Sequence, residues 1–90
     1  MINHKIISAR LQELRDLCGV TNVQLAAALD ATQSMVNAWH RGDVVPDIES
    51  LVQICRYYGV PADYLLGLCS YLPFDMRQQL LDRRVAAILT

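Results

Sequence analysis

Apolar positions along the chain follow a helical period almost throughout. From residue 7 to residue 18 they recur at three- and four-residue intervals, which places them on one side of a helix. No segment shows a convincing alternation of period two, the pattern typical of a half-buried strand. The sequence therefore predicts an all-α chain. The apolar side of the first predicted helix consists of Ile7, Leu11, Leu14 and Cys18.

Two short helices are predicted next, each about two turns long. The segment TNVQ begins at Thr21 and fits a capping box, in which Thr21 accepts from the backbone while Gln24 reaches back. After a turn at residues 30–31, Thr32 caps the other short helix and Gly42 ends it. Isolated helices of this length are marginal in water, so both must pack against the rest of the chain. The residues expected to face inward are Leu25, Ala26, Leu29, Val36 and Trp39.

Three further helices are predicted in the second half of the chain. Asp47 caps one that Gly59 ends, and Pro61 opens a short one that runs through Leu66. A sixth, amphipathic segment follows Pro73 and runs nearly to the end of the chain. The apolar side of the fourth helix consists of Ile48, Leu51, Ile54 and Tyr58, and that of the sixth includes Phe74, Leu81, Val85 and Ile88.

The outward side of the helix between Thr32 and Gly42 has small, polar side chains and no acidic one. Its members are Gln33, Ser34, Asn37, Ala38 and Arg41. Such a surface fits the DNA major groove, where an amide side chain can pair with adenine and a small residue can meet the thymine methyl group. An ordinary solvated helix face is the alternative interpretation of the same residues.

Five segments in a fixed order carry a resemblance to a known family. They read ARLQELRDLCGVT, QLAAAL, TQSMVNAWHRG, VPDIESLVQIC and YYGVPADYLLGL. From about Ser8 to Leu68 the chain resembles the lambda-repressor-like, Cro-type (XRE-like) helix-turn-helix family. The resemblance implies a compact five-helix DNA-binding domain over residues 1–68, with an additional C-terminal helix in residues 69–90. It also implies a sequence-specific transcriptional regulator, a small bacterial or phage-type repressor that binds double-stranded DNA, usually as a dimer.

The resemblance also assigns the residues that touch DNA. It places base contacts at Gln33, Ser34 and Ala38, with Asn37 beside them. It places contacts to the DNA backbone at Asn22, Thr32 and Arg41. Asn22 stands where the family often has a glutamine that touches a phosphate, so its shorter amide is expected to donate with less reach.

Several positions depart from the family pattern. Asp30 stands where the family often has glycine in the turn, and Pro61 stands where a hydroxyl cap is usual. The family frequently pairs an arginine of the first helix with a glutamate near the end of the third. Arg15 keeps the first partner, but His40 occupies the second position. Arg15 is therefore expected to bind a backbone carbonyl or to lean outward toward phosphate.

The charge balance speaks against DNA binding by a single subunit. The chain has a net charge of −1, and residues 1–67 hold five basic and seven acidic residues. DNA-binding domains are usually basic, so a helix-turn-helix protein-interaction module, or an antitoxin-like binder with weak or no DNA affinity, is the alternative function. However, Asp30 is the only acidic residue between positions 17 and 42. With so few cations per subunit, DNA binding is expected to require a dimer.

The C-terminal segment offers a source for that dimer. Its apolar residues are Leu80, Leu81, Val85, Ile88 and Leu89, and Met76 adds to them. This side either caps the core of its own subunit or pairs with a second copy. The sequence DRR at residues 82–84 is expected to face away from the domain as a solvated edge.

No pattern in the sequence indicates catalysis, a cofactor or a metal site. The three cysteines form no C-x-x-C pair, and the two histidines have no acidic or thiol partner at ligand spacing. The sequence also lacks a nucleophile–base pair and a glycine-rich phosphate loop. The chain is expected not to be an enzyme and to bind no small-molecule substrate. With neither a signal peptide nor a membrane-spanning run, a cytoplasmic location is expected.

Overall fold

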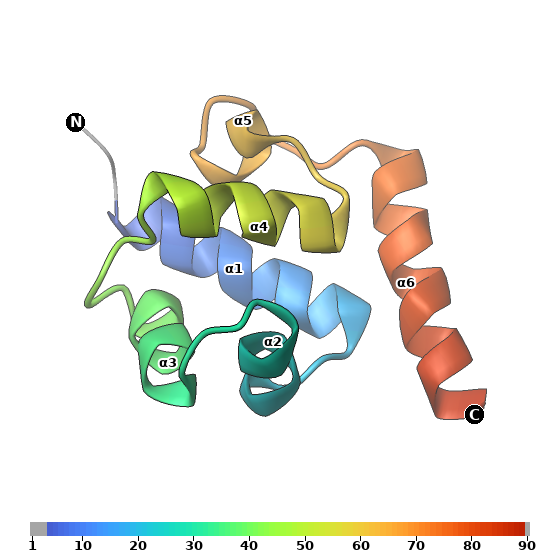
Figure 1. Ribbon diagram of the computed structural model, residues 1–90. Helices are drawn as coiled ribbons and strands as arrows, with labels where there is room; N and C mark the ends of the chain where they lie inside the picture. The colour runs from blue at the N-terminus through green and yellow to red at the C-terminus, as the bar shows by residue number, and fades with distance from the viewer. Residues whose placement is uncertain (1–3, 90) are drawn as a thin grey trace.

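Six helices and the turns between them make up residues 4–89, which are the residues described by this computed structural model (Figure 1). No strand occurs within that range, and the all-α prediction is confirmed. None of the described helices is long and apolar enough to cross a membrane. The helices are α1 (His4–Cys18), α2 (Asn22–Ala28), α3 (Gln33–Arg41), α4 (Ile48–Tyr58), α5 (Ala62–Leu65) and α6 (Phe74–Leu89).

Side-chain caps begin three of these helices where the sequence predicts them. At the start of α2, the Thr21 hydroxyl accepts from the Gln24 N–H at 3.1 Å, and the Gln24 side chain accepts from the Thr21 N–H at 2.9 Å. Thr32 and Asp47 likewise accept from the backbone N–H three residues on, at 3.1 and 2.8 Å. These bonds satisfy N–H groups that a helix start otherwise leaves without a partner.

The turn between α2 and α3 depends on a left-handed residue. Asp30 supplies it, with a φ of 53° at the position where glycine is common in the family. Aspartate tolerates this conformation better than most residues because its short side chain can bond locally. The turn therefore keeps its geometry without glycine, and α3 leaves it at a fixed angle to α2.

The hydrophobic core is built around α1, against which α3, α5 and α6 pack (Figure 1). The side chains expected to face inward from α1, α2 and α3 are all buried, and Trp39 is 4% exposed. The remaining helices add Ile54, Tyr58, Tyr64, Leu65 and Leu80 to the same cluster. The core thereby fixes which side of α3 faces solvent.

Ile48 departs from the expected apolar side of α4. It is 82% exposed, whereas Ile54 and Tyr58 on the same helix are buried. A helical side chain leans toward the N-terminal end of its helix. Ile48 is the first residue of α4, so its side chain lies beyond the turns of the helix that pack against the core and stays in solvent.

The apolar residues of α6 divide into an inner and an outer set. Leu80 is fully buried, and Leu81 is half-buried beside it. In contrast, Val85, Ile88 and Leu89 are 52%, 73% and 80% exposed. Only the middle of α6 therefore contributes to the core of its own subunit.

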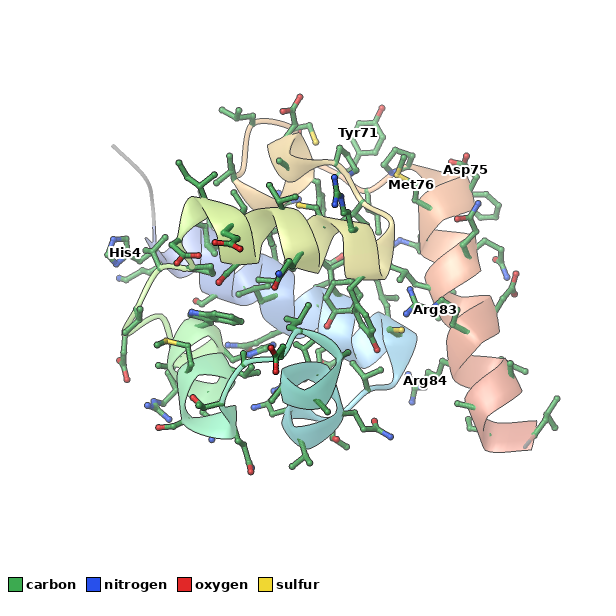
Figure 2. All side chains as sticks on the ribbon, in the orientation of Figure 1. His4, Tyr71, Asp75, Met76, Arg83 and Arg84 are labelled. Atoms are coloured by element: carbon green, nitrogen blue, oxygen red, sulfur yellow. The ribbon has the colours of Figure 1, made fainter. Side chains whose placement is uncertain are left out.

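Arginine side chains attach α6 to the rest of the domain (Figure 2). Arg77 forms an ion pair with Glu13 at 2.9 Å. Arg83 donates to the Tyr57 carbonyl at 2.9 Å and lies over the Tyr57 ring, and Arg84 donates to a carbonyl of α1 at 3.1 Å. The expectation that residues 82–84 face away is therefore wrong for both arginines, because they lie three and four positions after buried Leu80 on the same side of the helix.

The packing of α3 generates a test of stability. Trp39→Ala removes a large buried side chain and is expected to lower the free energy of unfolding by about 3–5 kcal/mol. Met35→Ala, at an exposed position of the same helix, is the matched control and is expected to change stability little. Chemical denaturation measures both variants. A Trp39→Ala protein as stable as the parent would refute the role of Trp39 as the anchor of α3.

Candidate nucleic-acid interface

The first turn of α3 projects into solvent. Thr32, Gln33 and Ser34 are all exposed, and Thr32 also holds the helix start through its cap bond. Val36 and Trp39 are buried on the opposite side of the helix. Because the core holds those two residues inward, the amide of Gln33 and the hydroxyl of Ser34 face outward on a rigid element.

Asn37 lies one turn further along α3 and belongs to a chain of hydrogen bonds. Arg15 Nη1 donates to Asn22 Oδ1 at 3.0 Å, and Asn22 Nδ2 donates to Asn37 Oδ1 at 2.7 Å. This Arg15–Asn22–Asn37 chain joins α1, α2 and α3. The hydrogen-bond partner of Arg15 is therefore a side-chain amide on α2 and not the backbone carbonyl expected from the sequence, while a contact of Arg15 with phosphate stays a prediction.

His40 is buried where the family often has a glutamate. The ring Nδ1 lies 2.8 Å from the Val36 carbonyl, which can only accept, so Nδ1 carries the proton. Nε2 has no hydrogen-bond partner within the described part of the chain. Burial lowers the pKa of the imidazole below its ordinary value of 6.5, and the Arg15 charge lowers it further against the opposing Val36 bond. The ring is therefore neutral at pH 7 and offers Arg15 no counter-charge.

An open hollow of about 360 Å³ lies where α1, α2 and α3 meet. Its lining contains two cations and no carboxylate: Gln12, Arg15, Asn22, Asn37, His40 and Arg41. Each cation has a carboxylate nearby, since Arg15 lies 3.6 Å from Asp16 and Arg41 lies 2.8 Å from Asp43. The second pair is exposed, and exposed ion pairs contribute at most about 1 kcal/mol, so a phosphate can replace Asp43 at small cost.

The structure brings the sequence-assigned residues into two groups. Gln33, Ser34 and the Thr32 cap form the exposed first turn of α3, and Asn22, Asn37 and Arg41 border the hollow. Ala38, on α3, is half-buried. The sequence did not predict the hydrogen-bond chain from Arg15 to Asn37. The one signal for it in the sequence was His40, at the position where the family often has a glutamate.

The comparison with known proteins matches the part of the chain that contains α2 and α3, where the candidate interface lies. A family model described as helix-turn-helix matches residues 11–65. The HTH-type transcriptional activator BcrR of Enterococcus faecalis is 34% identical over 58 residues, which cover 64% of this chain and 28% of BcrR. A crystal structure of a transcriptional regulator from Listeria innocua superposes with a TM-score of 0.66 and 25% identity, covering 92% of this chain and 85% of that one. The aligned segment of this chain thus spans a little over a quarter of the length of BcrR.

The buried His40 generates a test against pH. Because the folded protein holds this imidazole at a lowered pKa, the unfolded chain takes up its proton first as the pH falls. The free energy of unfolding is therefore expected to be intact above about pH 6.5 and to decrease below it. Urea denaturation between pH 7.5 and 5.5 measures this slope.

Two substitutions identify the group responsible for that slope. His40→Gln is expected to remove most of it, whereas His4→Gln, at an exposed position, is expected to keep it. An equal slope in the parent and in His40→Gln would assign the effect to another group.

Proposed function

Because the chain belongs to the helix-turn-helix family, we propose that it is a cytoplasmic, sequence-specific DNA-binding transcriptional regulator that places α3 in the major groove. One observation carries the proposal. The first turn of α3 presents Gln33 and Ser34 to solvent while the core holds the opposite side of the helix. A helix anchored in this way can enter the groove without the core repacking.

The proposed contacts divide into two classes. Gln33, Ser34, Asn37 and Ala38 read base edges, and Asn22, Thr32 and Arg41 contact the DNA backbone. Residues 1–68 form the DNA-binding domain in this proposal. The described relative is a transcriptional activator, so the repressor function inferred from the sequence stays a prediction.

A dimer through α6 is the second part of the proposal. One row of residues along α6 is spaced at alternating four- and three-residue intervals, the spacing that lets two helices pair. The row consists of Phe74, Gln78, Leu81, Val85 and Ile88. Val85 and Ile88 are exposed, and so is Phe74. Asp75 and Asp82 flank one side of this row, whereas Arg77 and Arg84 on the other side bind Glu13 and the Asp16 carbonyl of the same subunit. A second copy would therefore pair through the exposed apolar members of the row, Phe74, Val85 and Ile88.

A protein-interaction module is the second candidate function. The net charge of −1 favours it, and so do the carboxylates beside Arg15 and Arg41. Retention on heparin or mixed duplex DNA separates the two candidates. A DNA-binding protein is retained at low salt and released near 200 mM salt, because phosphate contacts release counterions.

Gln33 generates the test of base reading. An operator is first obtained by binding-site selection from random duplexes. Gln33→Ala is then expected to cost about 1–3 kcal/mol of discrimination between operator and mismatched duplex while leaving stability nearly unchanged. Gln53→Ala, an exposed amide on α4, is the control. Unchanged operator affinity in Gln33→Ala would remove this residue from the interface.

The outer side of α6 generates the test of the dimer. Ile88→Asp places a charge in the proposed pairing row and is expected to shift the protein to monomers and to lower operator affinity at least tenfold. Ala86→Asp adds the same charge outside that row and is expected to preserve both properties. Sedimentation equilibrium and operator titration measure the two effects. A monomeric Ile88→Asp protein with parental affinity would contradict the requirement for a dimer.

A further inference from the structure

The direction of the Arg15–Asn22–Asn37 chain is set by Arg15. An arginine side chain has only donors, so the amide atom that it meets on Asn22 must be the oxygen. The NH₂ group of Asn22 then faces Asn37, and the 2.7 Å contact must end on the Asn37 oxygen. Although amide oxygen and nitrogen are nearly alike in shape, the chemistry of the first residue fixes the orientation of both amides.

The orientation of Asn37 leaves a donor free. Its Oδ1 is occupied by Asn22, while its Nδ2 donates to no protein atom among residues 4–89. Asn37 follows Gln33 by four positions, so the two side chains lie on one side of α3. The unoccupied NH₂ group is therefore on the surface that the proposed function brings to the bases.

His40 helps to keep the hydrogen bonds running from Arg15 through Asn22 to Asn37. A glutamate at that position would attract the Arg15 guanidinium and free the Asn22 amide to turn. The neutral, buried imidazole offers no such charge. The carboxylate of Asp16 is 3.6 Å from Arg15 and highly exposed, so it competes weakly with the 3.0 Å bond to Asn22.

We propose that Arg15 and Asn22 are positioning residues that make Asn37 a donor toward DNA. At the base pair that Asn37 meets, the protein then prefers guanine, whose O6 and N7 accept, over cytosine, whose N4 amino group donates. This inference rests on the proposed function and adds a specificity to it. An amide that binds adenine uses its oxygen as acceptor and its nitrogen as donor. Asn37 differs because only its nitrogen is available to the base.

An isosteric change at Asn22 reverses the chain without touching Asn37. Asn22→Asp supplies only acceptors, so it still accepts from Arg15 but now requires Asn37 to donate toward it. The Asn37 oxygen then faces the bases and favours cytosine or adenine amino groups. Gln24→Glu is the matched control, because it adds the same charge to α2 and keeps the capping box with Thr21.

The DNA experiment measures the ratio of the affinities for G·C and for C·G at one base pair. The base pair read by Asn37 is the one whose preference disappears in Asn37→Ala, and affinities are compared with G·C and with C·G at that pair. The parent and Gln24→Glu are expected to favour guanine about tenfold, and Asn22→Asp is expected to favour cytosine. Arg15→Met is expected to bring the ratio close to one, and Arg15→Lys to retain it. A guanine preference that survives in Asn22→Asp would overturn the proposal.

The free protein gives a second readout that needs no DNA. In side-chain amide NMR spectra, the Asn22 NH₂ group of the parent is expected to be protected from exchange and the Asn37 NH₂ group to exchange freely. In Asn22→Asp, the Asn37 NH₂ group becomes the protected one. A freely exchanging Asn22 amide in the parent overturns the hydrogen-bond chain by itself. Failure to select any DNA, with the amide pattern as expected, instead contradicts the proposed function and the base preference built on it.

Discussion

The packing of Val36 and Trp39 into the core is the constraint on which the rest of the structure depends. A nine-residue helix is marginal alone in water, so α3 exists because its inner side is buried. Burying that side exposes Gln33 and Ser34 and directs Asn37 toward α2. The polar side chains that α3 exposes are thus a consequence of the packing of its inner side. The turn at Asp30 and the Thr32 cap fix where α3 begins.

The junction of the first three helices shows how a missing ion pair can be replaced. With a neutral His40 in place of an acidic residue, the Arg15 charge is satisfied by an amide oxygen on α2. A direct ion pair joins two helices, whereas the Arg15–Asn22–Asn37 chain joins three. The His40 Nε2 atom has no hydrogen-bond partner among residues 4–89, and a buried polar group without a partner costs stability.

The sequence predicted most of the fold because its signals are local. Thr21, Thr32 and Asp47 cap helices through atoms only three residues away, and the apolar period identifies the inner side of each early helix. The errors arose where distant residues decide. Arg83 and Arg84 bind carbonyls 26 and 68 positions away, and the sequence does not show that Leu80 rather than its neighbour Leu81 is the buried residue that sets their side of α6. The bond between Asn22 and Asn37 likewise joins residues that are distant in the sequence. The sequence therefore predicted the residues of the candidate site but not the hydrogen bonds that connect them.

The central claim is that the outer side of α3 meets DNA. Backbone amide NMR of the full chain, titrated with its selected operator duplex and with a scrambled duplex at the same salt, tests it most directly. The account predicts that operator-specific shifts concentrate in residues 32–41 and at Asn22, and that the scrambled duplex shifts the same region less. Shifts confined to α6 or α4, or equal responses to both duplexes, would contradict it.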